Sequence, residues 1–140
     1  MSFTTISNSI NSKTRTIYNS LSKDELDKFL SCKNKNVIVI KFGAEWCRPC
    51  NNIKNLLNNC FLDMPDNVLC YDINIDADCE LFNKLKSKKM VKTIPAILVY
   101  YCCNERDQWY ITDNNISSSD NKEIINFFKT IYDNAKKINN

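Results

Sequence analysis

Residues 37–50 read Val-Ile-Val-Ile-Lys-Phe-Gly-Ala-Glu-Trp-Cys-Arg-Pro-Cys. The β-branched, nearly continuous apolar run over residues 37–42 predicts a central strand that is covered on both faces. Gly43, the only glycine in the chain, ends this strand. From Cys47 onward apolar residues recur at helical spacing, which predicts a helix that ends before Pro65. The segment is expected to form a strand, a turn and a helix whose first turn holds both cysteines of the CxxC pair.

The flanking sequence alternates between predicted strands and helices, which favours an α/β fold. Ser22 with Glu25 forms a capping-box pattern at the start of a helix that runs to about Cys32. The other expected elements are strands at residues 16–21, 68–75, 96–101 and 108–112, and helices at residues 76–88 and from Asp120 onward. The last two strands would form a β-hairpin through a turn at residues 104–107. Two strands linked by a helix form a βαβ unit, whose right-handed crossover requires a parallel pair.

Length and charge indicate one ordinary globular domain. A chain of 140 residues is long enough for one domain with a core and too short to argue for two. Its 19 basic and 16 acidic residues give a net charge of +3, which is too balanced to indicate a nucleic-acid or membrane surface. We expect a flexible N-terminal tail over residues 1–15 and a single domain over residues 16–140.

The N-terminal segment is not expected to carry a secretory signal. Residues 1–12 are rich in Ser, Thr and Asn and lack an apolar core. No acidic residue precedes Asp24, which leaves an organelle transit peptide open beside the flexible tail. A cytoplasmic location is the expectation.

Eight cysteines without a secretory signal require a choice among a disulfide scaffold, a metal site and a redox centre. A disulfide scaffold is disfavoured outside oxidising compartments. The chain has no histidine and a single CxxC, so a structural zinc would need two further thiolates at no recurring spacing, and no metal is expected. Cys60 and Cys70 lie on apolar faces and are interpreted as core residues. The candidates for exposed thiols, in a regulatory disulfide or a dimer link, are Cys79, Cys102 and Cys103.

Cys47 and Cys50 are suited to thiol-disulfide exchange. A thiolate is the nucleophile in this reaction, and a helix N-terminus stabilises it through unpaired N–H groups and a partial positive charge. Cys50 lies one helical turn after Cys47, close enough to attack a mixed disulfide formed there and release the reduced substrate. Pro49 fits the first turn, where a missing N–H costs nothing, and stiffens the short loop. Cys47 is therefore the expected nucleophile and Cys50 the expected resolving cysteine.

Two motifs together resemble the thioredoxin family. Ala44-Glu45-Trp46-Cys47-Arg48-Pro49-Cys50 follows a hydrophobic strand, and Thr93-Ile94-Pro95 precedes a later one. The order of elements agrees over residues 16–134, which is nearly the whole chain. The resemblance implies a thioredoxin fold, a three-layer α/β/α sandwich with a central mixed five-stranded sheet.

The resemblance also assigns roles around the CxxC pair. It implies that Pro95 is the family's cis-proline, packed against the cysteines, with Thr93 and Ile94 offering backbone to an extended substrate peptide. Trp46 would flank the site as an exposed aromatic. Two plainer interpretations stay open, in which Pro95 is an ordinary strand-start proline and Trp46 an ordinary core residue.

Arg48 departs from the family, because thioredoxins commonly carry glycine at this position. A guanidinium beside Cys47 favours the thiolate, and a lower pKa of that thiol stabilises the dithiol form. We expect a more oxidising couple than that of a typical thioredoxin. The alternative is that Arg48 points into solvent and shifts little.

Lys41 is a second departure, because thioredoxins usually place a buried Asp there and pair it with a Lys on the following strand. The matching position on that strand is Asp72. Each charge would keep its partner after such an exchange, whereas either alone would be expensive to bury. The hypothesis is a Lys41–Asp72 pair beneath the active site, with Asp72 handling the proton of Cys50. In the alternative, Lys41 extends to the surface and Asp72 is solvated.

The predicted function is reduction or exchange of disulfides in protein substrates, with the Cys47/Cys50 pair as redox centre and no metal or organic cofactor. By the resemblance, thioredoxin reductase or glutathione would supply electrons, and a monomer is expected. Residues 113–120, which in the family usually hold a glycine and line the substrate groove, hold asparagines and serines here, so substrate preference stays open. A thioredoxin-fold binding or docking module with little redox turnover is the alternative, because the acid expected at Lys41 is absent. A zinc-binding structural domain is a third.

Overall fold

Residues 14–140 are described in the computed structural model, and most of the expected tail lies outside this range. Within it, a five-stranded sheet has the order β1-β3-β2-β4-β5. The strands are β1 (Ile17–Tyr18), β2 (Val37–Gly43), β3 (Val68–Asn74), β4 (Ala96–Tyr101) and β5 (Asn114–Ile116). β3 is parallel to both β1 and β2, whereas β4 is antiparallel to both β2 and β5. The predicted mixed five-stranded sheet is confirmed.

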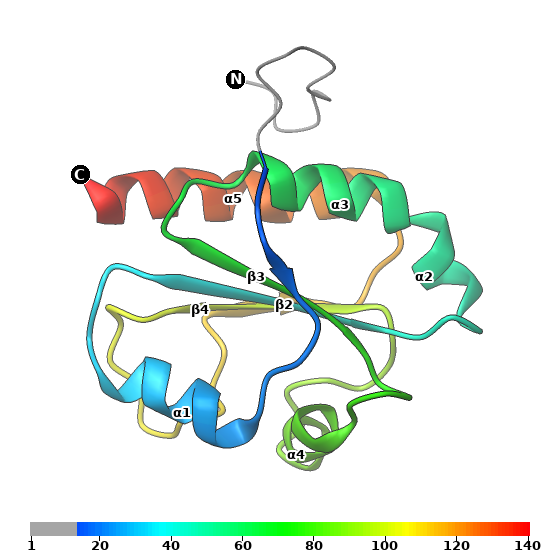
Figure 1. Ribbon diagram of the computed structural model, residues 1–140, viewed down its shortest axis with the longest axis horizontal. Coiled ribbons are helices and arrows are strands. Elements are labelled where there is room, and N and C mark those ends of the chain that lie inside the picture. Colours follow the sequence, from blue (N-terminus) through cyan, green and yellow to red (C-terminus); the bar gives the residue numbers. More distant parts are fainter. Residues whose placement is uncertain (1–13) are drawn as a thin grey trace.

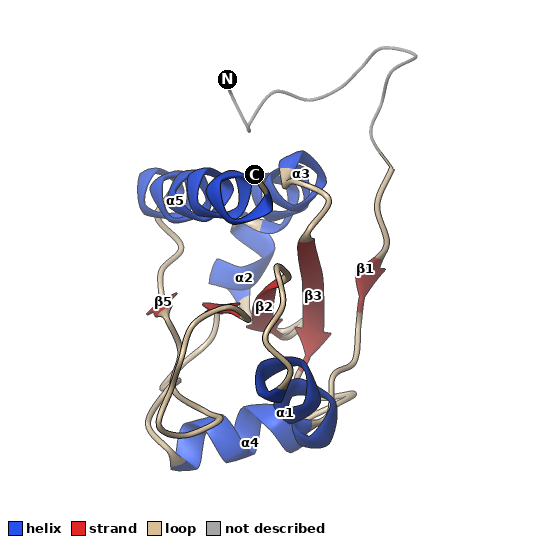
Figure 2. Ribbon diagram, turned by 90° about the vertical axis from the view of Figure 1, so that its left-hand side faces the viewer, coloured by secondary structure: helices blue, strands red, loops and turns tan. Residues whose placement is uncertain are grey.

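Helices cover both faces of this sheet. They are α1 (Lys23–Ser31), α2 (Arg48–Asn52), α3 (Lys54–Asp63), α4 (Glu80–Ser87) and α5 (Asn121–Asn139). Figure 1 shows α3 and α5 along one face and α1 and α4 along the other, and Figure 2 shows the same layers from the side. The predicted three-layer sandwich is confirmed.

The central strand β2 supplies side chains to two separate cores. Val37 and Val39 pack in the core under α3 and α5, whereas Ile38 and Ile40 pack in the core over α1 and α4. Successive side chains of a strand point to opposite faces, so a strand buried on both sides has a continuous apolar run. By this alternation Lys41 lies on the α3 side of the sheet, at the end where the CxxC pair follows.

The capping box predicted for α1 is present. Ser22 Oγ accepts the backbone N–H of Glu25 at 3.0 Å, and Glu25 Oε1 accepts the backbone N–H of Ser22 at 2.9 Å. These bonds satisfy two of the N–H groups that a helix start leaves without a partner.

The first strand is shorter than the predicted residues 16–21, because only Ile17 and Tyr18 pair with β3. Just before them, Arg15 fixes the chain to the same edge. Its guanidinium donates to the backbone carbonyls of Met64, Pro65 and Val68.

The single helix predicted after Cys47 is divided at Ile53. Ile53 has φ −105° and ψ 4°, and its N–H donates to the Cys50 carbonyl at 3.3 Å. This bond spans three residues, as in a 3₁₀ turn, and such a turn interrupts the regular α-helical bonding. Ile53 is fully buried at this break. α2 therefore carries the CxxC pair, and α3 covers the sheet.

The helix predicted from residue 76 begins four residues later, at Glu80. Asn74 directs the preceding turn: its side-chain Oδ1 accepts the N–H of Asp76 at 2.9 Å, and its carbonyl accepts the N–H of Asp78 at 2.9 Å. Asn side chains commonly close turns in this way. Residues 75–77 thus form a turn, and Ile75 packs against the CxxC cluster.

The prediction of a hairpin strand at residues 108–112 is wrong, because β4 pairs with Asn114–Ile116. The loop expected over residues 113–120 accordingly contains β5. Arg106 accounts for the shift: its guanidinium donates to the carbonyls of Tyr101 and Ile111 at 2.9 and 2.6 Å and to Asp113 at 2.9 Å. These bonds fold residues 108–112 into a turn, and pairing resumes beyond it.

Candidate active site

Cys47 and Cys50 are joined in a disulfide at the start of α2, with Cα atoms 5.2 Å apart. Cys47 is the N-cap residue, and its Sγ accepts the backbone N–H of Cys50 at 3.2 Å. Both cysteines are buried, Cys47 with 5% and Cys50 with 2% of its surface exposed. A hydrogen bond from a backbone N–H favours the thiolate once the disulfide is reduced.

The segment before β4 lies against this pair. The Ile94–Pro95 peptide bond is cis, and Pro95 is buried directly before β4. The carbonyl oxygen of Ile94 lies 3.9 Å from Cys47 Sγ, and the Ile94 side chain packs on the CxxC cluster. Thr93 is exposed on the approach to it. Residues 93–95, which are far from Cys47 in sequence, therefore border the reactive sulfur.

Trp46 is an exposed aromatic beside the pair and not a core residue. It exposes 69% of its surface, and its indole Nε1 donates to Asp76 Oδ2 at 2.8 Å. Asp76 belongs to the turn that follows β3. Asp76 directly follows the strand predicted at residues 68–75, which ends at the same edge of the sheet as β2. This position is the sequence signal that would have indicated Asp76 as a site residue.

Lys41 and Asp72 are partners across neighbouring strands. They are paired in the parallel register of β2 and β3, and Lys41 Nζ lies 3.1 Å from Asp72 Oδ1. The Lys41 side chain is 10% exposed and the Asp72 side chain 42%. The expected contact is present, but only its lysine end is buried.

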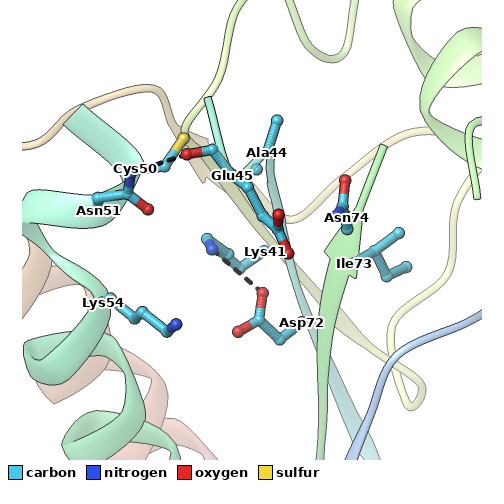
Figure 3. Close-up of a pocket in the computed structure, with 10 residues that line it drawn as sticks. Lys41, Ala44, Glu45, Cys50, Asn51, Lys54, Asp72, Ile73 and Asn74 are labelled. Atoms are coloured by element: carbon cyan, nitrogen blue, oxygen red, sulfur yellow. Dashed lines mark hydrogen bonds and ion pairs between the residues drawn. The ribbon is translucent and has the colours of Figure 1, made fainter. Parts of the chain in front are cut away.

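A polar pocket lies behind Cys50, between β2, β3 and the first turns of α2 and α3. It is lined by Lys41, Gly43, Ala44, Glu45, Cys50, Asn51, Lys54, Asp72, Ile73 and Asn74. Figure 3 shows Cys50 at one end of the pocket and the Lys41–Asp72 pair facing Lys54 at the other. The sequence did not indicate Gly43, Glu45, Asn51 or Lys54 as site residues, because the pocket forms only where β3 lies beside β2.

The sequence profile of the thioredoxin family matches residues 17–130. The chain belongs to the thioredoxin family. A relative, thioredoxin 3 of Plasmodium falciparum, is 31% identical over 90 residues, which cover 61% of this chain and 43% of that protein. Thioredoxin-T of Drosophila melanogaster is 33% identical over 60 residues, which cover 43% of this chain and 38% of that protein. The chain thus aligns with less than half the length of these two relatives.

A solved thioredoxin structure supports the same assignment. The crystal structure of a Plasmodium falciparum thioredoxin superposes with a TM-score of 0.57 at 29% identity, covering 81% of this chain and 84% of that chain. The thioredoxin fold is therefore shown both by sequence and by structure.

Two further residues of the thioredoxin CxxC motif are exposed in this chain. Arg48 and Pro49 occupy the first positions of α2 and face solvent. An exposed guanidinium is screened by water, so the strength of its action on Cys47 stays a prediction.

The free cysteines of this thioredoxin-family chain divide by burial. Cys60 and Cys70 are buried, as predicted, and Cys79 and Cys103 are exposed. Cys102 was expected among the exposed thiols but is buried, because it follows β4 directly and packs in the α1 and α4 core. Burial raises the pKa of Cys60 to about 12, and Asp63 adds to this. Burial also raises the pKa of Cys102 to about 11, despite an opposing effect of Arg106.

Over residues 14–140, no three Cys, Asp or Glu side chains converge as metal ligands. None of the helices in this range combines the length and apolar content needed to cross a bilayer.

Proposed function

We propose that this chain is a thiol-disulfide oxidoreductase that reduces or exchanges disulfides in protein substrates. The observation that carries the proposal is the Cys47–Cys50 pair, held at the start of α2 with the Ile94 carbonyl 3.9 Å from Cys47 Sγ. Membership of the thioredoxin family supports it. The proposed domain spans residues 16–140, preceded by the tail.

The reaction proceeds in two exchanges. The Cys47 thiolate attacks one sulfur of the substrate disulfide, which forms a mixed disulfide and releases the other substrate sulfur as a thiolate. The Cys50 thiolate then attacks Cys47 Sγ, which forms the Cys47–Cys50 disulfide and releases the second substrate sulfur. Two electrons pass from the dithiol to the substrate, and both substrate thiolates take up protons from water.

The surrounding residues have binding and tuning roles in this proposal. Trp46 offers an exposed aromatic surface, and Thr93, Ile94 and Pro95 offer an extended edge to a substrate peptide. The residues that tune the two thiols are Arg48, Pro49, Lys41 and Asp72.

Recycling needs an external electron donor. Thioredoxin reductase or glutathione is the proposed donor, in electron transport that maintains cell redox homeostasis in the cytoplasm. No metal or organic cofactor is needed, because the two thiols carry both electrons. The chain is proposed to act as a monomer.

Insulin reduction tests the proposal against a binding module with little turnover. With dithiothreitol as reductant, the native chain is expected to raise the rate at which insulin becomes turbid, and Cys47→Ser is expected to abolish this acceleration. Cys103→Ser, which changes an exposed free cysteine, is the matched control and should behave like the native chain. Equal rates for the native chain and Cys47→Ser would refute the proposal. Cys50→Ser should trap substrates as mixed disulfides on Cys47 and identify them.

A further inference from the structure

Gly43 lies at the end of β2, between Lys41 and Cys50. Its backbone does not require glycine, because Gly43 does not have a positive φ. Glycine also weakens a strand, since it has no side chain to pack. What it provides is space: a Cβ here would lie 2.8 Å from Lys41 Nζ, 3.0 Å from Lys41 Cε and 3.3 Å from Cys50 Sγ. The Lys41 ammonium and the resolving sulfur therefore both border the position of a Cβ at residue 43, and a methyl group there would clash with the ammonium.

Several charged groups surround the pocket behind Cys50. Lys41 comes from β2, Asp72 from β3 and Lys54 from α3, and Glu45 precedes the CxxC pair. The three atoms that come closest to the gap at Gly43 belong to Lys41 and Cys50, so no carboxylate oxygen lies as near to it as the ammonium. Lys41 is thus the charged group nearest to the position that a Cβ of residue 43 would take, which Cys50 Sγ also borders.

Asp72 holds the ammonium from the other side. Its Oδ1 accepts from Lys41 Nζ at 3.1 Å, and its side chain is far more exposed than that of Lys41. An exposed carboxylate is screened by water, whereas the buried ammonium acts on its neighbours with less screening. The pair therefore leaves a positive field at Cys50.

We propose that Lys41 is a positioning residue for Cys50, whose thiolate it stabilises through the opening left by Gly43. This inference rests on the proposed function, in which the Cys50 thiolate attacks Cys47 Sγ and the substrate sulfur leaves with the electron pair of the broken bond. Asp72 orients the ammonium, and the proton of Cys50 goes to water before the attack.

The test measures how readily Cys50 ionises. In a reduced Cys47→Ser background, which mimics the absence of a Cys47 thiolate in the mixed disulfide, the rate of Cys50 alkylation by iodoacetamide is followed against pH. Peptide mass spectrometry distinguishes Cys50 from the other cysteines. Lys41→Gln is expected to move the midpoint upward by about one pH unit, since an opposite charge at this range favours the ionised form. Lys129→Gln, on the exposed face of α5, is the matched control and should leave the midpoint unchanged.

Two more variants separate a charge effect from a structural one. Asp72→Asn frees the ammonium from its partner, so the midpoint should move downward, opposite to Lys41→Gln. Gly43→Ala keeps all charges but displaces the ammonium from the sulfur, so the midpoint should move upward. If Lys41→Gln does not fold, as judged by circular dichroism, the midpoints of Asp72→Asn and Gly43→Ala decide whether the Lys41 ammonium stabilises the Cys50 thiolate. An unchanged midpoint in Lys41→Gln, or an upward shift in Asp72→Asn, overturns the proposal.

Insulin reduction by the native chain separates this inference from the proposed function. If the native chain reduces insulin but Lys41→Gln does not change the midpoint of Cys50 alkylation, the inference is refuted and the proposed function stands. A chain that does not reduce insulin, but whose midpoint shifts as expected, refutes the function and leaves the action of Lys41 on Cys50 standing.

Discussion

Trp46 donates its indole N–H to Asp76 Oδ2 at 2.8 Å, although 69% of the Trp46 surface is exposed. A bond at the polar end of an exposed indole restricts its rotation and leaves the apolar ring available to a partner. Because Trp46 precedes Cys47 directly, the bond fixes an aromatic surface beside the reactive sulfur. The turn after β3 thus contributes to the site through the Asp76 carboxylate, and its Ile75 packs against the cluster that contains Cys47 and Cys50.

Asp76→Ala is expected to weaken binding of protein substrates. Loss of one side-chain hydrogen bond should raise the KM for a protein disulfide roughly 2- to 10-fold, because the freed indole must be ordered again on binding. Alkylation of Cys47 by iodoacetamide should keep its rate. In a Trp109→Phe background, Trp46 becomes the sole tryptophan, and its fluorescence anisotropy should fall. The exposed Asp133→Ala is the control, and an unchanged anisotropy in Asp76→Ala would contradict the prediction.

Arg48→Ala is expected to make the Cys47/Cys50 couple more reducing. Arg48 is exposed at the first position of α2, so its effect is screened, and the equilibrium constant with glutathione should change by only about two- to fivefold. Titration against glutathione mixtures, read by the fraction of disulfide, measures it. Lys122→Ala, at the start of α5, makes the same charge change away from the cysteines. A couple that becomes more oxidising in Arg48→Ala would refute the prediction.

Arg106→Met is expected to lower the free energy of unfolding by about 2 kcal/mol, because it removes the charge partner of the Asp113 side chain and the hydrogen bonds to the Tyr101 and Ile111 carbonyls. The Arg106 side chain is 7% exposed and that of Asp113 18%. Urea unfolding followed by circular dichroism measures the change. The neighbouring Glu105 pairs with Lys33 on the surface, so Glu105→Ala should cost less than about 1 kcal/mol. Similar losses for the two variants would show that the Arg106 bonds do not organise this turn.

Stability is expected to fall at alkaline pH. Burial raises the pKa of Cys60 from 9.0 to about 12 and that of Tyr71 from 10.0 to about 12. Above pH 9 the unfolded chain therefore binds fewer protons than the folded chain, so the free energy of unfolding declines until the folded groups also ionise near pH 12. Urea midpoints at neutral and alkaline pH measure this decline. Cys60→Ala should make it less steep, and an equal slope in that variant would contradict the assignment.

Local patterns in the sequence were sufficient for the elements that depend on neighbours along the chain. The β-branched run of β2 predicts a buried strand because its period matches two covered faces. Ser22 and Glu25 predict the start of α1 because the capping bonds join residues within one turn. Cys47 and Cys50 were indicated for the same reason, since their spacing alone places them on one helical turn.

Contacts between distant segments decided the rest. Arg106 bonds to residues on both sides of its own turn, and the last strand lies at Asn114–Ile116. The alternation of apolar and polar residues in a strand does not reveal such side-chain bonds. Lys41 and Asp72 were hypothesised as partners from the sequence, and the register in which β2 and β3 pair brings their side chains into contact. The sequence shows Gly43 only as the end of a strand. The structure shows that a Cβ at this position would contact Lys41 and Cys50. The sequence by itself determined which cysteines can exchange disulfides, and the tertiary structure decided which charge stands behind them, because the distance between side chains on different strands depends on how those strands pack.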